Sequence, residues 1–228
     1  MQSQRTMSII TAPSSLPLVA PSILSADFAN LGEECEKTLS AGADLLHLDV
    51  MDGHFVPNLT MGPALCKSLR KRMPNVYLDV HLMVNKPMDY IESFAEAGGN
   101  LFTGHVEAKV DPFVLAESIH NTGMDAGIAI NPPTDVEEIL PFVEAFDLIL
   151  VMSVNPGFSG QAFIPEVLTK VERISERLRP DQRLQMDGGV GVKTCSACRD
   201  AGCDVLVAAS AIFGTDDYAK AITGLRGY

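Results

Sequence analysis

The chain has 228 residues, of which 46% are hydrophobic and 20% are charged, and these proportions are typical of a compact folded protein and exclude a disordered one. Its formal net charge of -12 excludes a basic surface that would attract nucleic acid or anionic lipid. No apolar run approaches the roughly 18 residues of a membrane-spanning helix, so we expect a small-molecule ligand and neither a nucleic acid nor a membrane partner.

The first sixteen residues are polar and lack the apolar stretch of a secretory signal, which indicates an N-terminal extension on a cytoplasmic protein. Five cysteines, an odd number, favour the same reducing compartment. Cys195 and Cys198 form a CxxC with Cys203 nearby, but no second pair or close histidine completes a zinc site. We expect buried thiols on a helix, with a metal or redox role as the alternative.

A helix-ending glycine turn recurs along the chain at 41–44, 97–100, 122–125 and 201–204. The spacing between the glycines of successive turns is close to 26 residues or to two or three times this length. About 26 residues is the length of one strand plus one helix with short loops. Residues 17–228 accommodate eight such units. This spacing predicts an α/β protein with one catalytic domain at 17–228, a (β/α)8 TIM barrel.

The expected strands are rich in Val, Ile and Leu, as parallel strands covered on both faces are. They are 18–23, 44–51, 76–83, 101–106, 126–131, 147–153, 183–187 and 204–209. Helices are expected between them, including one beginning near Asp111-Pro112 and one near Pro133-Thr134-Asp135. The alternative, an open doubly wound sheet, would usually have a glycine-rich turn after the first strand, where this chain has Ser22-Ile23-Leu24-Ser25.

Ligand-type side chains alternate with apolar ones in the second expected strand, so that His47, Asp49 and Met51 share a face. The third strand places His81 inward and the seventh ends at Asp187. Because the strand ends of a barrel open onto one face, these side chains are expected to meet around one divalent ion. The four expected ligands are His47, Asp49, His81 and Asp187. Two imidazoles and two carboxylates suit zinc, iron, cobalt or manganese. The alternative is that His47 and Asp49 lie buried in the core and form hydrogen bonds with each other or with nearby backbone.

Glycine turns follow the last strands, at 155–161, 187–189 and 208–211. Such turns and helix N-termini present backbone N–H groups to an anion without requiring Lys or Arg. Phosphate sites of this fold commonly lie near the last strands, so we expect one here. The alternative is that each glycine only allows a tight connection.

Several of these motifs resemble the signature series of ribulose-phosphate 3-epimerases. They are Pro21-Ser22-Ile23-Leu24, the block from His47 to Asn58, Asp79-Val80-His81-Leu82-Met83, the loop from Asn155 to Gln161, and Asp187-Gly188-Gly189-Val190. The resemblance runs in order from about Leu16 to about Ile222. The block from His47 to Asn58 is its most specific part.

The resemblance implies interconversion of D-ribulose 5-phosphate and D-xylulose 5-phosphate in the pentose phosphate pathway, with one divalent metal ion. It implies that His47, Asp49, His81 and Asp187 bind the metal and that the two aspartates are the acid/base pair. Ser22 and His81 would contact the substrate. The residues implied to hold the phosphate are Gly157, Phe158, Ser159, Gly160, Gly188, Gly189, Ala209 and Ser210. Many relatives have glycine where this chain has Ser159 and Ala209, which would disturb the phosphate loops if either position required a positive φ.

The chemistry of epimerisation fits this pattern. Removal of the C3 proton beside the C2 ketone gives an enediolate, and inversion needs proton removal on one face and delivery on the other. Asp49 and Asp187 would lie three steps apart around the ring, on different sides of the sugar. Met51, Met83 and Met152 are expected to cover the planar intermediate, with ordinary packing as their alternative.

Other functions also remain open. They are an epimerase of a six-carbon ketose phosphate, an enediolate-stabilising sugar-phosphate lyase, and a non-catalytic phosphosugar-binding barrel. We also expect a homo-oligomer. His105 and Glu107 are inward rim residues without an assigned role, His54 is expected in a loop, His120 on a helix surface, and Asp52 in the organisation of the loop after the second strand.

Overall fold

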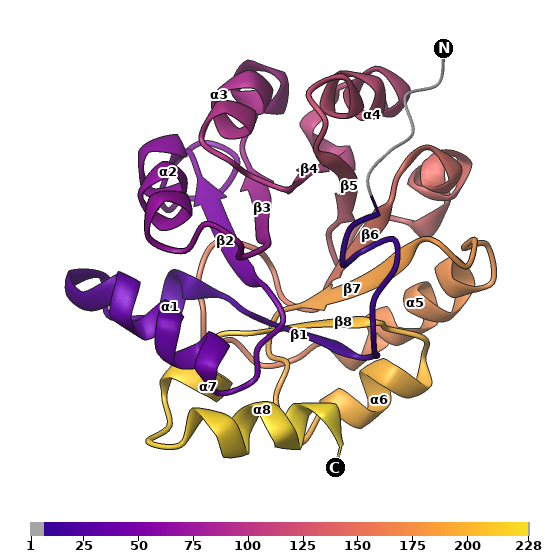
Figure 1. The fold of residues 1–228 in the computed structure, drawn as a ribbon. Coiled ribbons are helices and arrows are strands. Elements are labelled where there is room, and N and C mark those ends of the chain that lie inside the picture. The colour runs from indigo at the N-terminus through magenta and orange to yellow at the C-terminus, as the bar shows by residue number, and fades with distance from the viewer. Residues whose placement is uncertain (1–6, 228) are drawn as a thin grey trace.

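The computed structural model describes residues 7–227. The first six residues of the expected extension, and residue 228, lie outside this part of the chain. Within it, eight parallel strands form one sheet in the order β1-β8-β7-β6-β5-β4-β3-β2 (Figure 1). A parallel bridge between Ser22 and His47 and a hydrogen bond from Asp44 N to Val19 O (3.1 Å) connect β1 to β2. The sheet therefore curls into a barrel with helices between its strands, which confirms the expected fold and its single domain.

The strands lie within two residues of their predicted positions. They are β1 (Leu18–Pro21), β2 (Leu46–Met51), β3 (Leu78–Met83), β4 (Leu101–His105), β5 (Asp125–Ile130), β6 (Leu148–Met152), β7 (Arg183–Asp187) and β8 (Val205–Ala208). The α-helices are α1 (Leu31–Ser40), α2 (Pro63–Arg72), α3 (Ile91–Glu96), α4 (Pro112–Asn121), α5 (Leu168–Ser175), α6 (Cys195–Asp200), α7 (Ser210–Phe213) and α8 (Tyr218–Arg226). Short 3-10 helices are η1 (Ile23–Ser25), η2 (Phe28–Asn30), η3 (Pro87–Tyr90), η4 (Val106–Ala108), η5 (Val136–Glu138), η6 (Leu140–Ala145) and η7 (Pro165–Val167).

The two helix starts that were predicted from Asp and Pro have different outcomes. Asp111 caps α4, because its carboxylate accepts the N–H groups of Phe113 (2.9 Å) and Val114 (3.3 Å). The expected helix after 133–135 is instead the two 3-10 segments η5 and η6. Pro141 has no N–H to donate to the carbonyl four residues earlier, so an α-helix cannot run through this segment.

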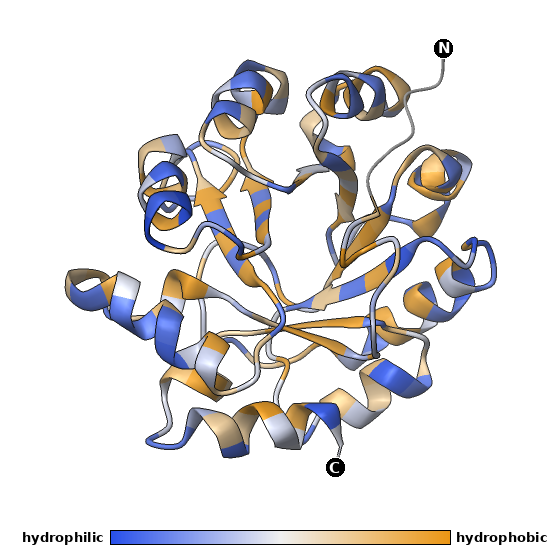
Figure 2. Ribbon diagram, in the orientation of Figure 1, coloured by the Kyte–Doolittle hydropathy of each residue, from blue (hydrophilic) through white to orange (hydrophobic). Residues whose placement is uncertain are grey.

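Apolar side chains fill both the inside and the outside of the barrel. The outward side chains of the strands, such as Leu46, Val80 and Ile128, pack against the helices in one large buried cluster. The barrel interior holds a second cluster that includes Leu18, Leu148 and Val205. Figure 2 shows the strands as largely hydrophobic, with hydrophilic residues gathered on helices and loops.

The segment before β1 passes over one end of the barrel (Figure 1). Ile10 is fully buried and belongs to the interior cluster. Ile9 lies beside Asp44 and Tyr77. Asp44 immediately precedes Leu45 of the interior cluster, and Tyr77 immediately precedes β3, so the segment covers the end of the barrel where the strands begin. Between residues 7 and 227, no helix is both long and apolar enough to cross a bilayer.

Candidate active site

The register of β2 and β3 brings the ligand-type side chains together. These strands pair in parallel with His47 opposite Asp79, Asp49 opposite His81, and Met51 opposite Met83. Side chains two residues apart on a strand share a face, so both rows point into the barrel mouth. Asp187, at the end of β7, approaches the same point from across the barrel.

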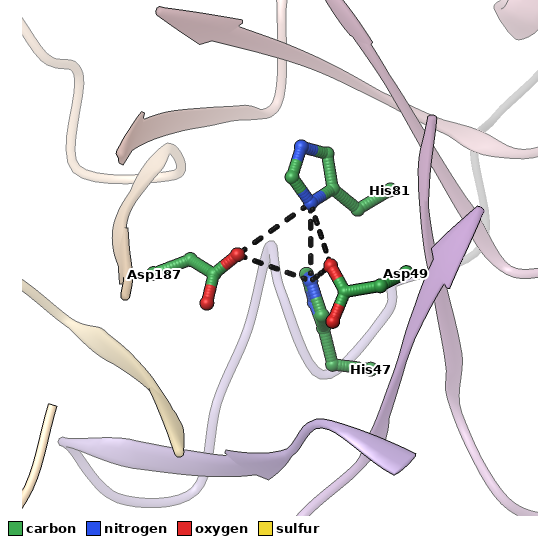
Figure 3. A group of neighbouring side chains, drawn as sticks. All are labelled: His47, Asp49, His81 and Asp187. Carbon is green, nitrogen blue, oxygen red and sulfur yellow. Dashed lines mark hydrogen bonds and ion pairs between the residues drawn. The ribbon is translucent and has the colours of Figure 1, made fainter. Parts of the chain in front are cut away.

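The side chains of His47, Asp49, His81 and Asp187 form a compact group of potential metal ligands (Figure 3). One donor atom from each lies within 4.8 Å of the others. His47 Nε2 is 3.3 Å from His81 Nδ1 and 3.4 Å from Asp49 Oδ1, while Asp187 Oδ2 is 3.6 Å from His81 Nδ1. Four donors at about 2.0–2.1 Å from a zinc ion would lie about 3.3–3.4 Å from one another. The group therefore fits a single four-coordinate divalent ion, as the alternation in the sequence predicts.

The two carboxylates enter this group from opposite sides. In Figure 3 Asp49 and Asp187 point toward each other, with the two imidazoles between them. β2 and β7 are separated in the barrel by β1 and β8, as the order of the strands requires. The second oxygen of Asp49 accepts a hydrogen bond from Ser22 Oγ, which fixes the rotation of that carboxylate.

Each imidazole has one nitrogen in the ligand group and a second nitrogen that lies within hydrogen-bond distance of another buried side chain. His47 Nδ1 lies 2.7 Å from Asp79 Oδ2, which also accepts a bond from Gln185 Nε2 (2.7 Å). His47 therefore carries a proton on Nδ1 and turns Nε2 toward the group, an arrangement typical of metal-binding histidines. No pattern in the sequence predicts this role for Asp79 or Gln185, although Asp79 precedes His81 by two residues and so shares its face.

Burial and neighbouring charge separate the proton affinities of the two carboxyl groups. Burial opposes ionisation of Asp49, but the adjacent His47 and His81 outweigh it and lower the pKa of Asp49 below its usual range. Burial, reinforced by the charge of Asp49, raises the pKa of Asp187 to about 7. One carboxylate and one carboxylic acid can therefore face each other across the site, as acid/base catalysis requires.

A cavity of about 280 Å³ opens directly above this group. Its lining contains almost all the expected site residues: Ser22, Asp49, Met51, Met83, Met152, Gly157, Phe158, Ser159, Gly160, Asp187, Gly188, Gly189, Ala209 and Ser210. His47 and His81 are fully buried beneath it. These residues lie in β2 and β3, at the ends of β6 and β7, and in the segments that follow β1, β6, β7 and β8, so only the barrel brings them together.

Two glycines after β7 are required by their surroundings. Gly188 and Gly189 have φ values of +114° and +62°. A Cβ on Gly188 would lie 2.5 Å from Val154, and one on Gly189 would lie 2.7 Å from the backbone nitrogen of Phe163. Ser159 and Ala209 are not in such a conformation, since Lys109 is the only non-glycine residue in 7–227 with a positive φ. Neither Cβ therefore faces the steric penalty of a positive φ.

Other polar residues lie apart from the group of four ligands. Asp52 organises the loop after β2 by accepting the N–H groups of His54 (2.8 Å), Phe55 (2.8 Å) and Asn85 (2.9 Å). His120 lies on α4 with its side chain partly exposed, and it pairs with Asp147 (2.9 Å).

All five cysteines are buried and free of disulfides. Cys195 and Cys198 lie on α6 as predicted. Burial raises the pKa of the Cys198 thiol to about 12, which opposes both thiolate chemistry and metal binding.

Comparison with known proteins identifies the family. Residues 18–213 match a family model described as "Ribulose-phosphate 3 epimerase family". The chain belongs to this family. It is 48% identical over 213 residues to the ribulose-phosphate 3-epimerase of Escherichia coli K12, covering 92% of this chain and 94% of that one. It is 46% identical over 212 residues to the cytoplasmic isoform of Oryza sativa, covering 91% and 92%.

Membership of the ribulose-phosphate 3-epimerase family confirms the resemblance seen in the sequence and the expected enzyme class, an isomerase. Solved structures with the same fold are more distant in sequence. They include a 3-hexulose-6-phosphate synthase (TM-score 0.68, 18% identity, 92% of this chain and 98% of that one). Another is a 3-keto-L-gulonate-6-phosphate decarboxylase from Vibrio cholerae (TM-score 0.68, 14% identity, 93% and 96%). At these identities the likeness concerns the fold alone.

Proposed function

We propose that this protein interconverts D-ribulose 5-phosphate and D-xylulose 5-phosphate, a step of the pentose phosphate pathway, by inverting C3. The observation that carries the proposal is the pair Asp49 and Asp187, which approach one ligand group from opposite sides beneath an open cavity. The names of the relatives with 40–48% identity support the same substrate.

The donor set fits one divalent metal ion, held by His47, Asp49, His81 and Asp187. Mixed imidazole and carboxylate donors suit zinc, iron(II), cobalt and manganese alike. When bound, such an ion supplies Lewis-acid stabilisation of negative charge on substrate oxygens, worth several kcal/mol.

Asp49 and Asp187 move the protons. In one direction one carboxylate removes the C3 proton while the other, as the carboxylic acid, donates a proton to the opposite face, and the roles exchange in the reverse direction. The difference between their proton affinities supports this division, since one group starts ionised and the other can retain a proton near neutral pH.

The rest of the cavity binds and shields the substrate. The turns at 157–160, 188–189 and 209–210 line the same cavity as Asp49 and Asp187, which supports their backbone N–H groups as the donors that hold the phosphate. Ser22 lines the cavity beside Asp49 and contacts the sugar. His81, for which the resemblance implies the same role, is fully buried beneath the cavity, so it acts through the metal rather than by touching the sugar. Met51, Met83 and Met152 line the same cavity and exclude water from the planar intermediate.

We also propose that the protein acts in the cytoplasm, which the name of the rice relative supports. The homo-oligomer remains a prediction, which light scattering of the purified protein tests directly.

The function is tested by incubating the metal-loaded protein with D-ribulose 5-phosphate in heavy water and following C3 deuteration and product by NMR, with and without a chelator. We expect D-xylulose 5-phosphate carrying deuterium at C3, and its loss on chelation. Deuterium uptake without a new epimer would favour the lyase, and neither event would favour the non-catalytic binder. Faster conversion of a six-carbon ketose phosphate would assign that substrate instead.

A further inference from the structure

A hydrogen-bonded network lies behind His81 and is not used by the proposed chemistry. His81 Nε2 lies 2.8 Å from His105 Nε2, and His105 Nδ1 lies 3.1 Å from Glu107 Oε2. Both imidazole side chains are fully buried, while 21% of the Glu107 side chain is exposed. We call these three residues, His81, His105 and Glu107, the His–His–Glu network.

Glu107 is held at the far end of this network by fixed donors. Its Oε1 accepts the N–H of Asn131 (2.8 Å) and the hydroxyl of Thr134 (2.6 Å). The loop that carries these donors is itself tied by Lys170, whose Nζ donates to the carbonyl oxygens of Asn131 (2.9 Å) and Pro132 (3.1 Å). Oε1 therefore faces donors only, and Oε2 remains the acceptor that faces His105.

This arrangement determines where the protons of the network lie. A carboxylate oxygen can only accept, so His105 must carry a proton on Nδ1 to bond Glu107. A neutral His105 then has an unprotonated Nε2, which can only accept the proton of His81 Nε2. His81 in turn has an unprotonated Nδ1, the atom that lies 3.1 Å from Asp49 Oδ1 and 3.6 Å from Asp187 Oδ2.

We propose that His105 and Glu107 are positioning residues that fix the tautomer of His81, so that its Nδ1 is free to bind the metal. The consequence for metal binding depends on the proposed function, whereas the tautomer itself does not. For His47 the carboxylate of Asp79 accepts the Nδ1 proton directly, at 2.7 Å. For His81 the carboxylate of Glu107 acts through the intervening imidazole of His105. This explains why a buried His-x-Glu on β4 and η4 lies beside the ligand group without contributing a donor to it.

The test is Glu107→Gln, which keeps the shape of the side chain and reverses the direction of the hydrogen bonds in the network. Asn131 N–H cannot become an acceptor, so the Gln carbonyl must occupy the Oε1 position and its NH2 group must face His105. His105 Nδ1 then has to accept, its Nε2 carries the proton, and His81 is forced to place its own proton on Nδ1 inside the metal site.

A second substitution should restore the original direction. A Gln at 105 can place its amide oxygen where His105 Nε2 lies and accept from His81, whatever stands at 107. The double variant Glu107→Gln/His105→Gln should therefore bind metal more tightly than Glu107→Gln alone. Asp147→Asn is the matched control, because it also converts the carboxylate partner of a histidine, His120, to an amide, but outside the network.

The primary readout is the tautomer of His81 in metal-free protein, measured by long-range 1H–15N NMR and assigned with a His81→Gln variant. We expect an Nε2 proton in the wild type and in the control, and an Nδ1 proton in Glu107→Gln. The dissociation constant for Zn²⁺, measured by chelator competition, should rise about 10- to 100-fold in Glu107→Gln and recover in the double variant.

A wild-type His81 with its proton on Nδ1 would overturn the proposal without any variant. An unchanged tautomer and Zn²⁺ affinity in folded Glu107→Gln would overturn it as well. If the wild-type tautomer is as expected but the protein binds no divalent metal, the proposed function fails and the positioning of His81 stands.

Discussion

His105 and Glu107 take their role in the site from the orientation of two imidazole rings. That role depends on which ring nitrogen faces which neighbour. Ring orientation follows from packing in the barrel, here against Phe55, whose ring centroid lies 5.0 Å from that of His105. The sequence pattern predicts that both residues point inward at the rim, but it cannot predict this orientation.

The four ligand residues could be predicted, because a strand that repeats ligand-type side chains at every second position brings them to one face. His47 and Asp49 on β2, His81 on β3 and Asp187 on β7 all lie in the ligand group. The residue behind His47 could not be predicted, because Asp79 supports it only through the register that places these two residues opposite each other. That register depends on contacts between strands, which no local pattern encodes.

Any side chain at position 189 should destabilise the turn after β7. Gly189→Ala should raise the KM for D-ribulose 5-phosphate and lower the free energy of unfolding by about 1–3 kcal/mol, because the alanine would need a positive φ and its Cβ would contact the backbone of Phe163. Steady-state kinetics and urea unfolding measure the two effects. Ala209→Gly, in the neighbouring turn, is the control and should change the KM little, since φ there is −105°. A Gly189→Ala enzyme with wild-type KM would exclude this turn from phosphate binding.

Secondary elements could be predicted best where both faces are buried. Continuous Val, Ile and Leu runs located the eight strands, because parallel strands of a barrel are covered on both sides. The prediction of an α-helix between β5 and β6 was wrong. An acidic residue and a proline at the start of this segment indicate a helix but do not show how far it continues. Pro141 ends any α-helical path there and leaves η5 and η6.

The helix α6 carries the CxxC and yields a prediction about reactivity. The thiols of the folded protein should not react with a disulfide reagent at pH 8, whereas all five should react in urea. All five thiols are buried away from the reagent. Burial also raises the pKa of Cys66 to about 11 and that of Cys198 to about 12, so the reactive thiolate of these two residues forms only as the pH approaches these values. Thiol titration of native and unfolded protein measures this. Rapid reaction of one or two native thiols at pH 8 would instead favour a redox role for the CxxC.

For the molecule as a whole, the repeat of strand and helix predicted the barrel. It did not predict how the end of the barrel where the strands begin is closed. We propose that the N-terminal extension closes it, because Ile10 is fully buried in the interior cluster with residues such as Leu18 and Val205 at the starts of strands. This contact could not be predicted from the sequence, since a short polar segment carries no periodicity.

Ile10→Ala should therefore lower the free energy of unfolding by about 2–4 kcal/mol, through lost burial and a residual cavity. The turnover number should not change, because Ile10 lies at the end of the barrel away from Asp187. Urea unfolding monitored by circular dichroism measures the effect. Met7→Ala is the control, since 79% of Met7 is exposed, and equal stability of the two variants would show that the extension does not close the barrel.

In the proposed mechanism two carboxylates act on C3 from opposite faces of one bound sugar. This is tested by exchange of the C3 hydrogen in heavy water, measured by NMR for Asp49→Asn and Asp187→Asn with each epimer separately at saturating metal. We predict that neither variant converts one epimer to the other, and that each exchanges the C3 hydrogen of one epimer only, a different epimer for each variant. Conversion by either variant, or exchange of the same epimer by both, would rule out this mechanism.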